Sequence, residues 1–303
     1  MNIIKKFEKL NLNEYPLKDI DDLLIKAENH AIMLTHLQQP ENQQLPIMIE
    51  RAVNNTKEEP VFSKTSRISF KPAKLNKSYL RASTPKNSMF YGSIISESDL
   101  LVNSPSDLGK IKDARIVSLS EISSLMRNSD VIEGWSRMTF GLWKIVEKIS
   151  LATIIDPLAK YNEQYLCSIQ DNYLNFLNQY SDEIKNNTLE YLKFLSKEFS
   201  KYVNSGNNHE YLISSKFTEH FVKKSSFDGV IYPSVQSKGY GLCVALHPRA
   251  IKKLELSSVT QGVLTKKIQK DPLSILSDYR LENEKFCWVS KGAENFELKH
   301  INR

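Results

Sequence analysis

Cysteine is scarce in this chain, and so are the patterns that hold metals or disulfides. The 303 residues include three cysteines, Cys167, Cys243 and Cys287, which are far apart in the sequence. No Cys-x-x-Cys pair is present, and no histidine lies at zinc-ligand spacing from a cysteine pair. We therefore expect neither a disulfide framework nor a structural metal site.

Long apolar runs are also missing. No run approaches the roughly 20 residues that a membrane-spanning helix needs. Residues 1–9 carry charges at the positions where a signal peptide has its apolar stretch. We therefore expect a cytoplasmic protein without a membrane partner, unless it is exported by a route that the sequence does not show.

Several catalytic motifs are absent. The chain has no G-x-S-x-G, no P-loop, no G-x-G-x-x-G and no H-E-x-x-H. Its six histidines do not lie at an interpretable spacing from a serine or a cysteine. These absences argue against ordinary hydrolases, nucleoside triphosphatases and dinucleotide oxidoreductases.

Charge of one sign is not concentrated anywhere. The net charge of +6 would suit an anionic partner, such as nucleic acid or a small molecule that carries phosphate. However, the lysines are mixed with acidic residues, and no dense arginine block occurs. We therefore expect that nucleic acid is not the principal partner.

The 41% hydrophobic content is ordinary for a soluble globular protein.

The first part of the chain has the pattern of helices. Apolar residues recur every three to four positions from Leu17 to Ala31, which predicts a helix over residues 16–38. A second short helix is predicted over residues 46–53, followed by a polar linker to residue 60. We interpret residues 1–60 as an N-terminal helical extension.

From residue 61 the pattern predicts an α+β fold with a central mixed β-sheet. Helices are expected over residues 120–127 and 131–149, and a helical insertion is expected at about 160–205, with a break at Asn186–Asn187. We interpret 61–256 as one domain and 257–303 as a C-terminal extension of uncertain role. Short apolar or alternating runs bounded by Pro, Gly, Asn and Ser predict strands over 67–70, 88–94, 114–119, 229–232, 242–246 and 286–289.

A serine at the end of one predicted strand is the first candidate site residue. The apolar run from Phe227 ends on Pro233, which denies the strand its next backbone donor. Ser234 follows, ahead of a glycine-flanked turn at 238–241. A small hydroxyl at such a corner suits ligand binding better than a core position. No histidine is placed to activate it, so we expect it to position a ligand and not to act as a nucleophile.

Two arginines are candidates for anion binding. The guanidinium group offers a rigid fork of donors that matches phosphate. Arg81 precedes Ala82-Ser83-Thr84-Pro85, small loop residues that would let an anionic ligand approach. Arg67 lies fourteen residues earlier. For both, a surface arginine near a turn is the alternative interpretation.

A tyrosine and a glutamate complete the set of candidates. Tyr91 ends a strand-like run before Gly92, where it would stack on a flat heterocycle or pack as a sheet aromatic. Glu121 opens a predicted helix, where the helix dipole alone also favours a carboxylate. Glu97 competes with Glu121, because it lies nearer to Tyr91 in the sequence.

Two stretches together carry a family resemblance. Leu80-Arg81-Ala82 followed by Phe90-Tyr91-Gly92-Ser93 is one, and residues 227–234 followed by the glycine turn and Val244-Ala245-Leu246 is the other. In this order they resemble the RES domain family, named for an arginine, a glutamate and a serine. The resemblance covers roughly residues 61–256. The family is similar in fold to ADP-ribosyltransferases, and several members are bacterial toxins paired with an antitoxin.

The resemblance implies consumption of NAD, or transfer of ADP-ribose from NAD to a protein, without a metal. It assigns the arginine to Arg81, with Arg67 as a second basic position, and places Tyr91 and Ser234 at the nicotinamide end. The glutamate is best matched by Glu121, with Glu97 as the alternative. Cleavage of the nicotinamide–ribose bond builds positive charge on the ribose, which a carboxylate stabilises. The alternative is an inactive RES-like module that binds a partner through its helical additions.

Overall fold

A computed structural model describes most of the chain, in the ranges 3–38, 47–95, 117–118, 121–123, 133–161, 164–204, 206–224, 227–234, 241–266, 273–282 and 285–290. The chain divides into two compact units, and each unit combines three segments. Helices and strands both occur, so the predicted α+β class is confirmed. Unit 1 comprises Met1–Gln38, Lys71–Tyr91 and Glu147–Lys253, and unit 2 comprises Gln39–Phe70, Gly92–Val146 and Leu254–Arg303.

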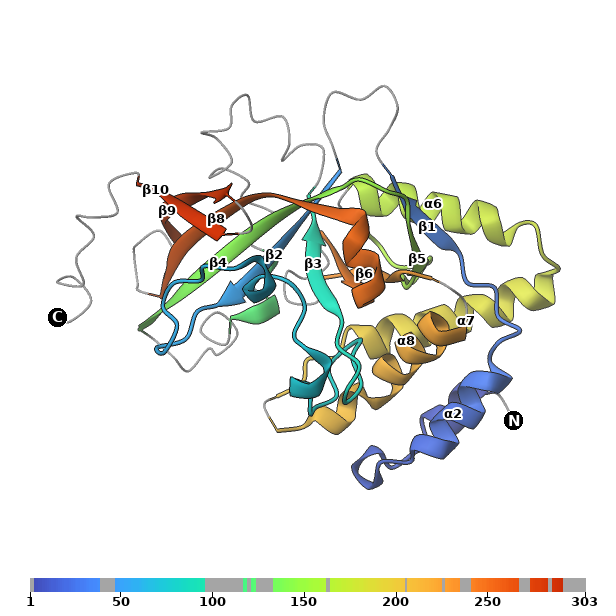
Figure 1. Ribbon diagram of the computed structural model, residues 1–303. Helices are drawn as coiled ribbons and strands as arrows, with labels where there is room; N and C mark the ends of the chain where they lie inside the picture. The colour runs from blue at the N-terminus through green and yellow to red at the C-terminus, as the bar shows by residue number, and fades with distance from the viewer. Residues whose placement is uncertain are drawn as a thin grey trace. The chain divides into compact units, whose positions relative to one another are not determined.

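Unit 1 contains the long helices. Among them, α7 and α8 lie side by side and α2 packs against α8 (Figure 1). The α-helices are α1 (Ile3–Phe7), α2 (Leu17–Lys26), α6 (Gln164–Leu177), α7 (Asp182–Phe199) and α8 (Leu212–Lys224). The short 3₁₀ helices of this unit are η1 (Leu12–Glu14), η3 (Ala73–Leu75), η5 (Asn208–Tyr211) and η6 (Pro248–Lys253).

A mixed sheet in the order β1-β5-β6-β7 completes unit 1. Only β5 and β6 in this order run parallel, and a parallel pair needs a long crossover connection. Helices α6, α7 and α8 lie in that connection. All residues of β6 and β7 are buried, which explains their apolar sequences. The strands are β1 (Leu34–Leu37), β5 (Ile149–Thr153), β6 (Gly229–Pro233) and β7 (Leu242–Leu246).

Unit 2 is built on an antiparallel sheet in the order β3-β2-β4-β8-β9-β10. The long strands β4 and β8 pair along their length, with a register shift at Leu142/Trp143. Strand β3 pairs with β2, and the boundary between the units falls within β3, after Tyr91. The strands are β2 (Met48–Asn54), β3 (Phe90–Ile94), β4 (Gly134–Ile145), β8 (Leu254–Lys266), β9 (Leu273–Glu282) and β10 (Lys285–Ser290).

The first sixty residues are only partly helical, so the predicted helical extension is wrong in its second half. Helix α2 ends at Lys26, and the ring of His30 then bonds the carbonyl of Ala27 at 2.7 Å. The chain continues into β1, which pairs with β5. The helix predicted over 46–53 is strand β2, with β3 on one side and β4 on the other.

The helix predicted over 131–149 is also wrong, because Gly134–Ile145 forms strand β4. All six residues from Met138 to Trp143 are buried. A strand that is buried on both faces loses its alternation of apolar and polar residues, so its pattern resembles that of a buried helix.

The predicted strands differ in outcome. The strands predicted over 88–94, 229–232, 242–246 and 286–289 correspond to β3, β6, β7 and β10. The strand predicted over 67–70 is absent, because the 3₁₀ helix η2 (Thr65–Arg67) and a bend occupy this part of the chain. In the range 114–119, only residues 117–118 are described, and they are helical.

The helices predicted at about 160–205 are present as the pair α6 and α7, although the predicted break between them is misplaced. The two helices separate over 178–181 and not at Asn186–Asn187, which lie inside α7. Asp182 and Glu183 in the first turn of α7 complement the positive end of its dipole.

Candidate functional site

Arg81 lies inside unit 1 at the C-terminal end of α7. Its Nη1 donates to the carbonyl oxygen of Phe199, and its Nη2 donates to that of Lys201 at 3.2 Å. Its Cζ lies 5.3 Å from the ring centroid of Tyr211. The last carbonyls of a helix lack intrahelical donors and carry partial negative charge. Arg81, which is 6% exposed, therefore caps α7.

Tyr91 is tied to the residues that follow Arg81. Its hydroxyl accepts the backbone N–H of Ala82 at 3.1 Å and lies 2.7 Å from Oγ of Ser83. Burial raises the pKa of Tyr91 to about 12, although the hydrogen bonds from Ser83 and Ala82 and the charge of Arg81 act in the opposite direction. The phenol is therefore neutral near pH 7 and acts through hydrogen bonds.

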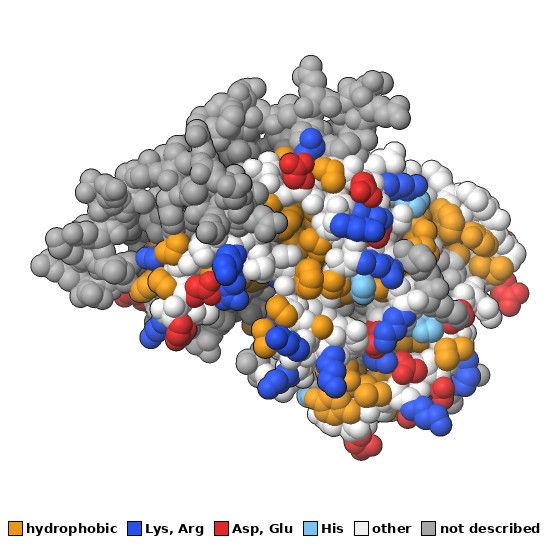
Figure 2. Space-filling view, in the orientation of Figure 1, with side chains coloured by type: hydrophobic (Ala, Val, Ile, Leu, Met, Phe, Trp, Pro, Cys, Tyr) orange, Lys and Arg blue, Asp and Glu red, His pale blue; other side chains and the backbone are white. Residues whose placement is uncertain are grey.

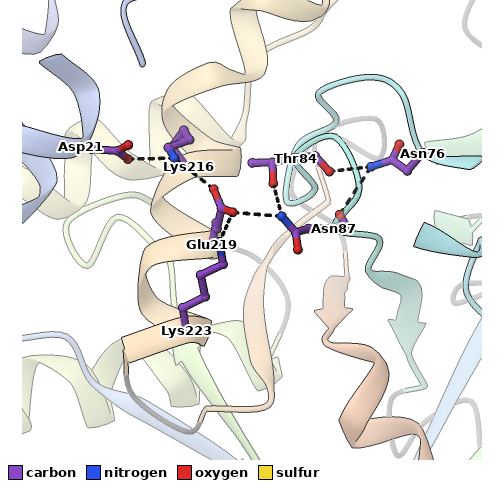
Figure 3. Close-up of polar contacts among 7 residues, drawn as sticks. All are labelled: Asp21, Asn76, Thr84, Asn87, Lys216, Glu219 and Lys223. Atoms are coloured by element: carbon purple, nitrogen blue, oxygen red, sulfur yellow. Dashed lines mark hydrogen bonds and ion pairs between the residues drawn. The ribbon is translucent and has the colours of Figure 1, made fainter. Parts of the chain in front are cut away.

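Two tight turns shape the loop that carries these residues. Isolated antiparallel bridges join Leu80 to Ser83 and Thr84 to Asn87. The buried Asn76 closes the second turn, because its Nδ2 donates to the carbonyl oxygens of Thr84 at 2.7 Å and Asn87 at 3.4 Å (Figure 3). We call residues 76–91 the arginine loop.

The second family-like stretch reaches the same end of α7. The ring of Phe199, whose carbonyl accepts from Arg81, lies 5.4 Å from the ring of Tyr232 in β6. Ser234 follows two residues later, and its N–H donates to the carbonyl of Gly241 at 3.1 Å. Phe199 therefore contacts residues of both stretches within unit 1.

Ser234 differs from its expected setting. It was expected at an open corner, but it is only 1% exposed. Gly241, which accepts its backbone N–H, has a φ of 75°, a conformation that glycine adopts readily. The glycine turn predicted at 238–241 otherwise lies outside the described residues.

Arg67 belongs to unit 2 and has partners of its own. Its Nη2 lies 2.5 Å from Oε2 of Glu59, and its Cζ lies 5.0 Å from the ring centroid of Phe62. The side chain of Arg67 is 44% exposed. An exposed ion pair of this kind contributes about 0–1 kcal/mol to stability.

Glu121 lies in a helical stretch of unit 2 and is partly buried. Ser118, which is also helical, donates from Oγ to the carbonyl of Glu50 at 3.1 Å and lies 2.9 Å from Oγ of Ser93. Since Ser118 gives its proton to Glu50, Ser93 donates to Ser118. These bonds hold Ser118 against β2 and β3.

Two residues of strand β3 form hydrogen bonds to residues that lie near the candidates in the sequence. Tyr91 contacts Ser83, and Ser93 contacts Ser118. The competing glutamate, Glu97, lies outside the described residues.

Three residues near the candidates were missed by the sequence analysis. Tyr211 lies over Arg81, and Asn76 closes the arginine loop. Glu50 is a fully buried carboxylic residue of β2, directly opposite Ser93 of β3. A single tyrosine, asparagine or glutamate has no distinctive local pattern, so only their tertiary neighbours reveal them.

The described surface and helices carry further features that bear on metals, membranes and charged partners. On the face drawn in Figure 2, the described basic side chains are interspersed with acidic ones. Among the described residues, no group of three or more His, Cys, Asp or Glu is arranged to hold a metal ion. No helix in the described ranges has both the length and the apolar character to cross a bilayer.

Comparison of the chain with protein-family models, with curated proteins and with solved structures finds no significant match. The resemblance to the RES domain therefore stays a prediction from the residues.

Proposed function

We propose that this protein consumes NAD by breaking the bond between nicotinamide and ribose, as a RES-type enzyme with an ADP-ribosyltransferase-like core. The supporting observation is the convergence on Phe199. Arg81 from one family-like stretch and Tyr232 from the other both contact this residue, although the stretches are far apart in the sequence. A shared site requires such a convergence.

In the proposed reaction, the C1′–N bond of NAD breaks and its electron pair goes to the nicotinamide nitrogen. The ribose becomes oxocarbenium-like, and Glu121 stabilises its charge. Arg81, with Arg67 as a second basic position, binds the pyrophosphate. Tyr91 and Ser234 position the nicotinamide end. Water, phosphate or a protein side chain then attacks C1′, and the proton of the acceptor is released.

The test is an assay of nicotinamide release from NAD, run with and without phosphate and with product analysis. ADP-ribose indicates hydrolysis, a phosphorylated ADP-ribose indicates phosphorolysis, and label on protein indicates transfer. Glu121→Gln should abolish release while the far-ultraviolet circular dichroism stays that of the wild type. Glu255→Gln is the matched control, because it removes an exposed carboxylate in the same unit.

The outcomes separate the parts of the proposal. If the wild-type protein releases no nicotinamide, the proposed NAD reaction is wrong. If Glu121→Gln keeps full activity, Glu121 is not the carboxylate that stabilises the ribose. Glu97→Gln is then the variant to test. If the protein is a toxin with an antitoxin partner, its expression in a bacterium should stop growth and lower cellular NAD, and the Glu121→Gln variant should do neither.

One observation favours the alternative, a catalytically inactive RES-like module. Arg81 is 6% exposed, and two of its donors bind carbonyls of the chain, as in an arginine that stabilises the fold. The module would act through its helical additions, α6 and α7. Absence of NAD turnover, together with a stable complex with one defined partner, would support it.

A further inference from the structure

Glu219, an acidic residue of α8, forms a hydrogen bond with a side chain of the arginine loop. Glu219 accepts at Oε1 from Nδ2 of Asn87 at 2.9 Å, although 132 residues separate them (Figure 3). Asn87 also donates to Oγ1 of Thr84 at 2.9 Å. Both hydrogens of the Asn87 amide are therefore used, one within the loop and one on α8.

Two lysines of α8 hold the carboxylate of Glu219 in place, and Asp21 of α2 contacts one of these lysines. Nζ of Lys216 lies 3.0 Å from Oε2 of Glu219 and 2.9 Å from Oδ1 of Asp21, while Nζ of Lys223 contacts Oε1 (Figure 3). The side chain of Glu219 is 13% exposed, and both of its carboxylate oxygens are contacted. Its orientation is thus set by residues of its own helix before it meets Asn87.

The charge of Glu219 is maintained by the same neighbours. Burial by itself would raise the pKa of this carboxyl, but hydrogen bonds from Lys223 and Lys216 and their charges outweigh it and lower the pKa below its ordinary value. Glu219 is therefore ionised near pH 7, and its bond to Asn87 is charge-assisted.

We propose that Glu219 is a positioning residue that fixes the second turn of the arginine loop through Asn87 and thereby sets the place of Arg81 and Tyr91. The loop is also bound to α7 by Arg81 itself, whereas the bond to α8 holds the loop without involving the guanidinium group. The consequence for turnover rests on the proposed NAD reaction, but the ordering of the loop does not.

The first experiment measures hydrogen exchange in the arginine loop without any ligand. The amides of Ser83, Lys86 and Asn87 donate backbone hydrogen bonds there. In Glu219→Ala we expect their exchange to accelerate about three- to tenfold, because Asn87 loses a charged acceptor that is partly accessible to water. Glu8→Ala is the control, since it removes an exposed carboxylate in the same unit.

A reciprocal exchange of partners makes the test sharper. In Asn87→Asp two carboxylates face each other, and the loop should exchange as fast as in Glu219→Ala. In the double variant Asn87→Asp with Glu219→Gln, the glutamine amide can donate to the aspartate, so protection should return. Unchanged exchange in both single variants, or a double variant as fast as Asn87→Asp, would overturn the proposal.

The second experiment separates positioning from folding. If the loop is displaced, the KM for NAD should rise several-fold in Glu219→Ala, because Arg81 is the proposed pyrophosphate ligand, and the double variant should recover. A purely structural role would lower kcat in proportion to the folded fraction and leave KM unchanged, which would contradict positioning. If the wild-type protein releases no nicotinamide, the proposed NAD reaction is wrong. The hydrogen-exchange measurement alone then decides whether Glu219 positions the arginine loop.

Discussion

Arg81 donates a hydrogen bond to the carbonyl oxygen of Phe199, and 118 residues separate the two. Phe199 is the last residue of α7, and its ring also contacts Tyr232 of β6. One residue therefore joins the arginine loop, a helix end and the buried strand before Ser234. The same bond serves the fold and, in the proposed reaction, the site.

Replacement of Arg81 should destabilise unit 1. Arg81→Met keeps much of the buried stem but leaves the carbonyls of Phe199 and Lys201 without their donors, which should lower the free energy of unfolding by about 3 kcal/mol. Arg81→Lys should lose less, because an ammonium group keeps the charge but lacks the fork of donors. Urea unfolding of the three proteins checks this order. Wild-type stability of Arg81→Met would show that the cap contributes nothing.

Gly229 at the start of β6 should not tolerate a side chain. A Cβ at this position would lie 2.0 Å from the carbonyl oxygen of Ala245 in the paired strand β7. The clash involves backbone, which a rotamer change cannot relieve, so Gly229→Ala should cost about 2–3 kcal/mol of stability.

A second glycine provides the comparison for this clash. Gly206 has a φ of 97°, and no atom of the described residues lies within 4 Å of the place that a Cβ would occupy there. Gly206→Ala should therefore cost only about 1 kcal/mol, which comes from backbone strain. Thermal unfolding of both variants measures the difference. Equal destabilisation by the two substitutions would contradict the steric explanation.

Stability should fall as the pH drops below 6.5, partly because of His247. Burial and the charge of Arg249 lower the pKa of this imidazole from 6.5, against the influence of Asp228. Its Nδ1 accepts the N–H of Arg249 at 3.2 Å, which requires that nitrogen to be unprotonated. The unfolded chain therefore takes up a proton first as the pH falls, and folding loses free energy from pH 6.5 down to the folded pKa.

The variant His247→Asn isolates this contribution. Asparagine keeps an acceptor but does not titrate, so its free energy of unfolding should change less between pH 7 and pH 5 than that of the wild type. A residual slope is expected from His36, whose pKa is lowered by burial and by Lys148. An identical slope in both proteins, measured by urea unfolding at each pH, would exclude His247 as a source.

Local sequence patterns predicted some elements and failed for others for a physical reason. Strands β6 and β7 and helices α6 and α7 have patterns that match their length and burial. Strands β2 and β4 were taken for helices, because neighbours on both sides and buried faces remove the alternation that identifies a strand. Strand β2 also contains Glu50, whose side chain is fully buried although it is an acidic residue.

The residues of the candidate site were also predicted from the sequence only in part. Arg81, Tyr91 and Ser234 were selected from residue type and local setting, since each follows or precedes a turn at a strand end. The meeting of Arg81 and Tyr232 at Phe199, and the bond between Asn87 and Glu219, have no local signal. Nothing in a helical stretch marks the residue that will receive a distant donor.

The sequence by itself determined the α+β class, the buried strands near residues 229–246, the helical pair and the residue types that suit an anionic ligand. These follow from apolar patterns and turn residues that act over a few positions. Only the tertiary structure decided that α7, β6 and the arginine loop meet, because buried donors and acceptors must be satisfied by whichever groups the packing of distant segments brings near.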